Sequence, residues 1–155
     1  MCKRILVAID GSIHSQQALP TAIQMAKKFD SELLVLHVSE HDRGRAVVFS
    51  LETPAQATIM VGDAVNAARK AGVKASGKLD DVAAGHVAKA IVETADANGI
   101  DLIVMGSRGL SDVQGLMLGS VTHKVVQTSN RPVLIARPSN TKALATNGAV
   151  ASFKV

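Results

Sequence analysis

Four glycines lie close together in one stretch of the sequence, GSRGLSDVQGLMLGS, directly after the apolar run DLIVM. They are Gly106, Gly109, Gly115 and Gly119, and Ser120 and Thr122 follow the last of them. A tight turn accounts for one or two glycines but not for four. Glycine lets backbone N–H groups approach a ligand without a Cβ in the way, and a helix start adds N–H donors and a positive dipole end. This combination favours the binding of a phosphate group.

The spacing of these residues excludes the two common phosphate-binding loops. A Walker A loop requires G-x-x-x-x-G-K-[ST], and the complete pattern occurs nowhere in the chain. A dinucleotide-binding loop requires G-x-G-x-x-G after the first strand, where this chain has the tripeptide DGS. The pattern that remains is G-x-x-G, nine residues, then G-S, formed by Gly106, Gly109, Gly119 and Ser120.

Five short runs rich in Val, Ile and Leu predict the strands that would position this loop. Several of them are continuously apolar instead of alternating, which is typical of strands buried on both faces of a sheet. The runs are Ile5–Ile9, Glu32–Val38, Val73–Leu79, Leu102–Met105 and Pro132–Ala136.

Segments with helical spacing separate the predicted strands. The first is expected to be capped by Ser15, with Pro20 delaying or bending its start. The other three helices are expected at Val61–Lys70, Val87–Ala97 and Ser120–Thr128. Strands that alternate with helices pair in parallel, with right-handed crossovers. The sequence therefore predicts an α/β fold with an open, doubly wound parallel sheet and helices on both faces.

The length of the chain indicates one domain with its own core. We expect this domain at residues 1–138, followed by a flexible extension at residues 139–155 that is rich in Ala, Ser, Thr and Asn. Residues 41–60 carry charges, a glycine and a proline, and are expected to form a long mobile connection before the second helix.

The net charge of +4 lies entirely at the C-terminal end of the chain. Residues 1–130 contain equal numbers of basic and acidic residues, whereas residues 131–155 contain four basic residues and no acidic one. A nucleic-acid-binding surface favours a basic stripe on the folded body and aromatic residues for base stacking. This chain has three Phe and no Tyr or Trp, so nucleic-acid binding is not expected.

The N-terminal segment and the cysteine content indicate a cytoplasmic protein. The apolar run ILVAI has five residues, which is too short for a signal peptide or a membrane span. The single cysteine, Cys2, cannot form an internal disulfide and suits a reducing compartment. The five histidines are scattered without a metal-binding spacing, so no metal site is assigned to the protein itself.

The glycine pattern resembles that of the nucleotide-binding branch of the universal stress protein family, which carries G-2x-G-9x-G-[ST] after its fourth strand. Other similar segments are ILVAIDGS, LLVLHV, DLIVMGSRG and VTHKVVQTSNRPVLIAR, so the resemblance covers residues 3–137. It implies a five-stranded sheet of order 3-2-1-4-5, whose first and fourth strands are neighbours at the topological switch point. Ligands of such sheets bind beyond the carboxyl ends of the strands at that point. Asp10 and Gly106 would therefore line one cleft.

The resemblance also implies roles for the residues of this cleft. Adenine would contact Ala8, Ile9 and Val38. The phosphates would be held, through backbone N–H and hydroxyl groups, by Gly109, Gly119, Ser120, Val121 and Thr122. The floor would be shaped by Met105, Gly106 and Arg108.

Two of these assignments have plain structural alternatives. Asp10 would meet the ribose or a phosphate-bound Mg²⁺, but an aspartate at this position also suits a cap for the following turn. Arg108 would lie at the cleft, but an arginine in a loop is commonly only solvated.

The implied function is that of a stress-response regulator, a homodimeric sensor or switch that binds ATP, or AMP or ADP, with Mg²⁺. One alternative is a slow Mg-dependent ATPase, but the glycine stretch has no lysine and the sequence shows no water-orienting group, so no catalytic residue is assigned. The other alternative is a dimeric stress protein that binds no nucleotide. The homodimer is expected to pair through the edge strand Pro132–Arg137.

Overall fold

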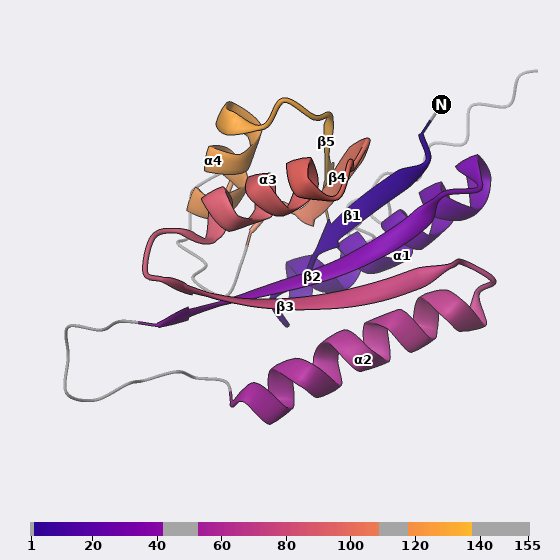
Figure 1. The fold of residues 1–155 in the computed structure, drawn as a ribbon, viewed down its shortest axis with the longest axis horizontal. Helices are drawn as coiled ribbons and strands as arrows, with labels where there is room; N and C mark the ends of the chain where they lie inside the picture. Colours follow the sequence, from indigo (N-terminus) through magenta and orange to yellow (C-terminus); the bar gives the residue numbers. More distant parts are fainter. Residues whose placement is uncertain (1, 42–52, 109–117, 138–155) are drawn as a thin grey trace, which may run out of the picture.

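The computed structural model describes residues 2–41, 53–108 and 118–137 (Figure 1). Five strands alternate with four helices along these residues. The strands are β1 (Arg4–Ala8), β2 (Glu32–His41), β3 (Ala75–Ala83), β4 (Leu102–Gly106) and β5 (Val133–Ala136). The helices are α1 (Ile13–Phe29), α2 (Pro54–Lys70), α3 (Val87–Ala97) and α4 (Ser120–Thr128). Residues 139–155, expected to form an extension, lie outside the described residues, and the boundary at 138 stays a prediction.

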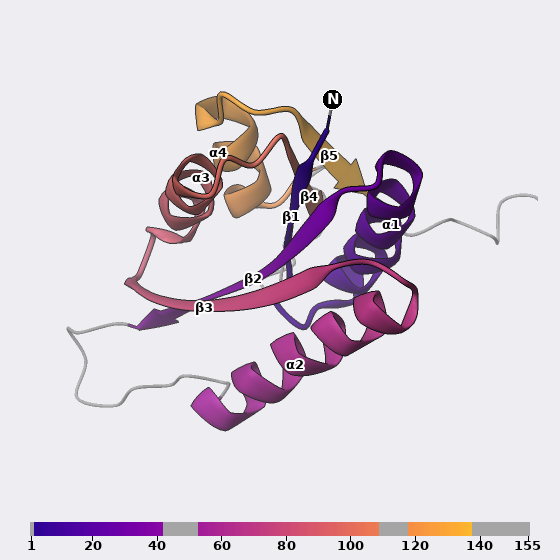
Figure 2. The same ribbon diagram turned by 45° about the vertical axis from the view of Figure 1, so that its right-hand side comes forward.

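The strands form one parallel sheet in the order β3-β2-β1-β4-β5, which confirms the predicted fold class. β1 lies in the centre and pairs with β2 on one side and β4 on the other. Helices α1 and α2 cover one face of the sheet, and α3 and α4 cover the other (Figures 1 and 2). The β1 residues Ile5, Leu6 and Val7 have no exposed surface. Burial on both faces explains why this strand is continuously apolar.

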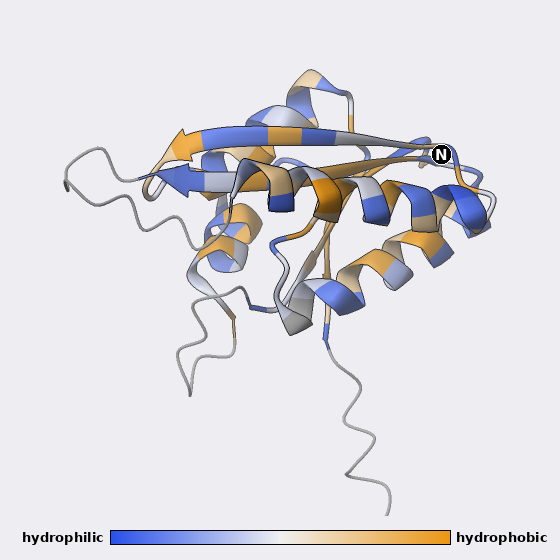
Figure 3. Ribbon diagram, turned by 90° about the horizontal axis from the view of Figure 1, so that it is seen from below, coloured by the Kyte–Doolittle hydropathy of each residue, from blue (hydrophilic) through white to orange (hydrophobic). Residues whose placement is uncertain are grey.

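The sheet separates two hydrophobic cores. Alternate residues of β1 enter different cores: Ile5 and Val7 pack with α1 and α2, whereas Leu6 packs with α3 and α4. Hydrophobic and hydrophilic residues alternate along the helices, as the colours of Figure 3 show. Many of the buried helical residues are alanines, which let the helix axes approach the sheet closely.

The connection expected at residues 41–60 is shorter than the sequence indicated. His41 belongs to β2, and α2 begins at Pro54, so the expected helix start at Val61 is wrong by two turns. Thr53 and Gln56 form a capping box: the Gln56 N–H donates to Thr53 Oγ1 at 3.2 Å, and the Thr53 N–H donates to Gln56 Oε1 at 2.8 Å. Pro54 suits the first helical position because that residue needs no N–H partner. Residues 42–52 lie outside the described part.

The clearest further differences from the sequence-based prediction concern α1 and β3. Ser12, not Ser15, caps α1, because the Ser15 N–H donates to Ser12 Oγ at 3.1 Å. Pro20 lies inside this helix and does not delay its start. The third strand is β3, Ala75–Ala83, rather than Val73–Leu79, because the Val73 N–H donates to the Ala68 carbonyl at the end of α2.

Asp101 fastens the start of β1 to the start of β4. Its Oδ2 accepts hydrogen bonds from the backbone N–H of Lys3 at 2.7 Å and of Arg4 at 3.0 Å. These two bonds favour the ionised carboxylate and lower the pKa of Asp101 below its ordinary value. The amino ends of β1 and β4 are therefore joined by a side chain as well as by the hydrogen bonds of the sheet.

Replacement of Gly77 by alanine is expected to destabilise the domain by about 1–3 kcal/mol. A Cβ at this position of β3 would lie 2.5 Å from Val61 Cγ1 on α2. Valine is stiff at χ1, so the backbone of α2 or β3 would have to shift. Urea unfolding followed by circular dichroism measures the change in free energy. Adding Val61→Ala should recover part of the loss, because the two sites are in contact.

Gly62→Ala is the matched control. Gly62 lies inside α2, and its added Cβ would meet no heavy atom of the described residues within 4 Å. Alanine has the higher helix propensity, so this change should stabilise the protein by up to about 1 kcal/mol. Equal effects of alanine at positions 62 and 77 would contradict the close packing of β3 on α2.

Candidate functional site

The carboxyl ends of β1 and β4 lie side by side, as expected at a topological switch point. Ala8, the last residue of β1, is in register with Leu36 on β2 and with Met105 on β4. The chain leaves β1 for α1 on one face of the sheet and leaves β4 for α4 on the other (Figure 2). The two loops diverge there. The residues that the structure brings together at the carboxyl ends of these strands are Ala8, Ile9, Asp10, Met105 and Gly106.

The turn from β1 into α1 is held by backbone and side-chain bonds. The Ile9 N–H donates to the Leu36 carbonyl at 2.9 Å, and the Ser12 N–H donates to Asp10 Oδ1 at 3.0 Å. Gly11 has a φ of +78°, a conformation that favours glycine. One oxygen of Asp10 therefore stabilises the turn, while Ser12 caps the helix itself.

The start of α4 is tied to the end of β4 by two hydrogen bonds. The Gly119 N–H donates to the Ser107 carbonyl at 2.8 Å, and Thr122 Oγ1 donates to the Gly106 carbonyl at 3.0 Å. Ser107 also donates its own N–H to the Ala136 carbonyl on β5 at 3.1 Å. Thr122 is 3% exposed, so its hydroxyl serves the fold. Gly109 and Gly115 lie outside the described residues.

The N-terminus of α4 has the character of an anion-binding site. Gly119 is the N-cap, with φ −66° and ψ 157°, which any residue can adopt. The backbone conformation at position 119 therefore does not require a glycine. No side chain within the described part of the chain caps this helix, and its first turn contains no acidic residue. The first-turn N–H groups and the helix dipole together attract a negatively charged group.

The remaining residues implied for the cleft lie around these two loops. Val38, on β2, is half-buried on the α3 side of the sheet. Arg108 follows β4 and is half-buried, and it takes part in an interaction with another residue. Ser120 is exposed and Val121 is half-buried in the first turn of α4.

A buried histidine near the cleft had no role in the sequence-based interpretation. His37 is 3% exposed, and its Nδ1 lies 2.8 Å from the Ile9 carbonyl oxygen. The sequence signal was a histidine inside the apolar run LLVLHV. Farther along β2, His41 Nδ1 lies 2.9 Å from Asp81 Oδ1. Within residues 2–41, 53–108 and 118–137, no three His, Cys, Asp or Glu side chains gather in a way that could hold a metal ion.

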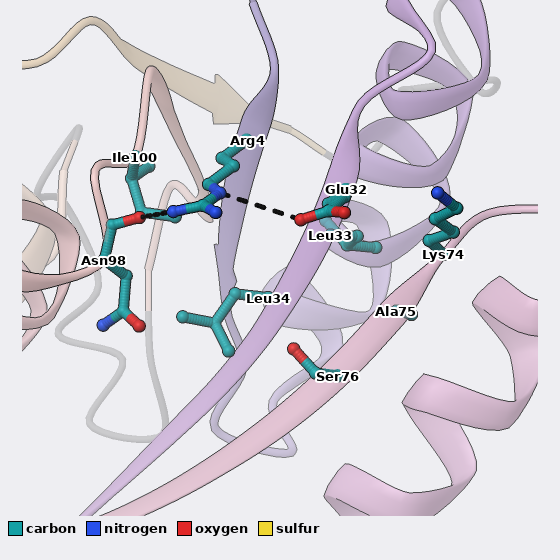
Figure 4. Close-up of a pocket in the computed structure, with 9 residues that line it drawn as sticks. All are labelled: Arg4, Glu32, Leu33, Leu34, Lys74, Ala75, Ser76, Asn98 and Ile100. Atoms are coloured by element: carbon teal, nitrogen blue, oxygen red, sulfur yellow. Dashed lines mark hydrogen bonds and ion pairs between the residues drawn. The ribbon is translucent and has the colours of Figure 1, made fainter.

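A groove of about 380 Å³ lies at the other end of the strands, away from these two loops (Figure 4). It is lined by residues at the amino ends of β1, β2 and β3 and around the α3–β4 turn. Its arginine is already engaged: Arg4 Nε lies 3.7 Å from Glu32 Oε2, and Nη1 donates to the Asn98 carbonyl at 3.0 Å. The groove lies at the amino ends of the strands, whereas the α4 N-terminus follows the carboxyl end of β4, so the two are separate.

None of the helices in the described part of the chain combines the length and the apolar character needed to cross a membrane.

Comparison with known proteins identifies the relatives of this chain. The sequence model of the universal stress protein family matches residues 1–137. Universal stress protein YxiE of Bacillus subtilis is 37% identical over 153 residues, which cover 88% of this chain and all of YxiE.

Solved structures give the same family. The structure of MJ0577, from Methanocaldococcus jannaschii, superposes with a TM-score of 0.75 at 28% identity, over 91% of this chain and 99% of that protein. A universal stress protein in complex with cAMP superposes with a TM-score of 0.66 at 29% identity, over 87% of this chain and 97% of its own.

Thr122→Val is expected to destabilise the protein by about 1–3 kcal/mol, because the buried Gly106 carbonyl would lose its hydroxyl donor. Thr122→Ser keeps the hydroxyl and should lose less. Thr128→Val is the matched control on the same helix: its hydroxyl bonds the Lys124 carbonyl at 2.8 Å, but the residue is exposed to water. Thermal and urea unfolding compare the three variants. Equal losses at positions 122 and 128 would contradict a structural role for the Thr122 hydroxyl.

Proposed function

Because the chain belongs to the universal stress protein family, we propose that it binds an adenine nucleotide at the carboxyl ends of β1 and β4. In this proposal it acts in the cytoplasm as a homodimeric sensor or switch of the stress response. The nucleotide is ATP, or AMP or ADP, and Mg²⁺ accompanies the phosphates. The observation that carries the proposal is the N-terminus of α4, where a glycine is the N-cap although the backbone does not require one.

The phosphates would bind at this helix N-terminus. A side chain at Gly119 would occupy the space that a phosphate oxygen needs in order to reach the N–H groups of the first turn. Ser120 adds an exposed hydroxyl at the same end. Thr122 would contribute its backbone N–H, since its hydroxyl donates to Gly106. Gly109, which the motif also assigns to the phosphates, stays a prediction.

The nucleoside would bind above the end of β1. Ala8, Ile9 and Val38 would surround the adenine, and Met105, Gly106 and Arg108 would form the floor of the cleft. Asp10 would contact the ribose or the Mg²⁺, a cation that is commonly bound by one carboxylate together with substrate phosphates. The related protein solved with cAMP supports an adenine nucleotide as the class of ligand.

Binding without rapid hydrolysis fits the residues around α4. Phosphoryl transfer requires charge neutralisation and a group that orients the attacking water. The stretch GSRGLSDVQGLMLGS contains one arginine and no lysine, and its two other polar candidates, Asp112 and Gln114, lie outside the described residues. A slow Mg-dependent ATPase is the second candidate, and hydrolysis of bound ATP faster than its dissociation would favour it.

The two edges of the sheet differ in their suitability for dimer formation. The edge strand β3 carries Lys78, Asp80 and Asp81, and charges on an edge oppose pairing with another chain. The edge strand β5 consists of Val133, Leu134, Ile135 and Ala136 and carries no charge. The homodimer is therefore proposed to form through β5 and its flanking residues, Pro132–Arg137.

Mg-ATP is expected to raise the melting temperature of the purified protein. A ligand that binds only the native state stabilises it by about 2.7 kcal/mol at a hundredfold excess over Kd. Gly119→Asp should abolish this shift, because the carboxylate would cap α4 and repel the phosphates, while the unliganded protein keeps or slightly gains stability. Gly62→Asp adds the same charge on α2 and should keep the shift. No shift for the wild type with Mg-ATP, Mg-ADP or AMP would overturn the proposed function.

Ile135→Pro is expected to convert the dimer to a monomer. The carbonyls of Pro132 and Ala136 accept bonds from β4, so the backbone groups of Ile135 point to the open edge and proline removes a donor there. Leu79→Pro is the matched control on the β3 edge and should stay dimeric. Sedimentation velocity measures the species, and circular dichroism verifies the fold. A monomeric wild type at micromolar concentration would contradict the β5 dimer.

A further inference from the structure

A buried imidazole lies beneath the turn that forms one wall of the proposed cleft. His37 is on β2, and its side chain is on the same face of the sheet as Leu33 and Val35, which belong to the core formed with α1 and α2. Those two neighbours are apolar, whereas position 37 places a polar ring in a site that is 3% exposed. A buried polar ring is unfavourable unless its nitrogens are hydrogen-bonded.

The hydrogen bonds of the ring define its tautomer. Nδ1 lies 2.8 Å from the Ile9 carbonyl oxygen, which can only accept, so Nδ1 carries the proton. Nε2 lies 3.3 Å from Ser39 Oγ, and in the neutral ring it accepts from the Ser39 hydroxyl. The result is a chain of bonds from Ser39 through His37 to Ile9.

Ile9 is thereby held by β2 at both of its backbone polar groups. Its N–H donates to the Leu36 carbonyl at 2.9 Å, and its carbonyl accepts from His37. The Ile9 carbonyl and the Asp10 N–H belong to one planar trans peptide and point in opposite directions. Since the carbonyl points to β2, the Asp10 N–H points toward the β4 side of β1, where the proposed cleft lies.

We propose that His37 is a positioning residue of the nucleotide site. Its Nδ1–H bond sets the plane of the Ile9–Asp10 peptide and, with it, the place of Asp10 relative to the base and ribose. This inference rests on the proposed function. His37 itself makes no contact with the ligand, and it acts through the carbonyl of Ile9.

Substitutions that keep or remove the Nδ1 donor test this role. His37→Asn places an amide N–H donor near the position of Nδ1, His37→Gln places it nearer to that of Nε2, and His37→Leu removes it. Titration calorimetry with Mg-ATP should give a Kd within a few-fold of wild type for His37→Asn and a Kd raised about tenfold or more for the other two. Equal affinity of wild type, His37→Gln and His37→Leu would overturn the proposal.

A matched core variant separates positioning from general loss of stability. Ile100→Val removes one buried methylene just before β4, at the amino ends of the strands and away from the proposed cleft, and should lower the melting temperature without changing the Kd. A Kd that rises equally for Ile100→Val and for His37→Leu would reduce His37 to an ordinary core residue.

Two spectra of the unliganded protein test the geometry directly. In ¹H–¹⁵N spectra, His37 should show the Nδ1-protonated tautomer, and the Asp10 amide resonance should move in His37→Leu but little in His37→Asn. The Nε2-protonated tautomer, or an unmoved Asp10 amide in His37→Leu, would overturn the inference. If these spectra agree but the wild type binds no nucleotide, the proposed function fails and the positioning role at the cleft fails with it, while the bond to Ile9 stands.

Discussion

The parallel pairing of β1 with two different neighbours is the constraint on which the rest of the molecule depends. Because β1 pairs with β2 on one side and β4 on the other, the chain leaves β1 and β4 over opposite faces of the sheet: β1 leads into α1 and β4 leads into α4. This reversal leaves a gap between the β1–α1 and β4–α4 connections. A sheet of this strand order has one such switch point, and ligands bind there. The reversal also buries the centre of β1, Ile5–Val7, and residues buried on both faces of a sheet have to be apolar.

The loops at this gap are held together mostly by backbone groups. Ser107 uses its N–H for β5 and its carbonyl for the N-cap of α4, and Ile9 uses both of its backbone groups for β2. Side chains serve the same purpose at Thr122 and His37, whose polar atoms bond backbone carbonyls. A phosphate held by helix N–H groups would require such rigidity, since peptide groups cannot follow a ligand as a long charged side chain can. The physical basis of the candidate site is therefore the placement of peptide groups.

The sequence was informative where one local pattern decides the structure and much less so where distant segments decide it. The continuous apolar runs located β1 and β4, because burial on both faces leaves no alternative to apolar residues. The sequence pattern places the start of α2 too late although Thr53, Pro54 and Gln56 form a recognisable capping box, because charges and a proline are also typical of a loop. The end of β3 at Ala83 depends on pairing with β2, and the bond from His37 to Ile9 spans 28 residues. No local pattern reports either contact.

The direction of the strands bears on how the protein can be attached to a support. β1 starts where Asp101 binds Lys3 and Arg4, at the amino ends of the strands, whereas Asp10 follows the carboxyl end of β1 and Gly119 precedes α4. A tag ahead of Cys2 would anchor the molecule with the proposed nucleotide site facing solution. β5 ends beside Ser107, so a partner fused directly after Arg137 would lie next to the proposed cleft. Immobilised or fluorescent forms of this protein should therefore be built from the N-terminus.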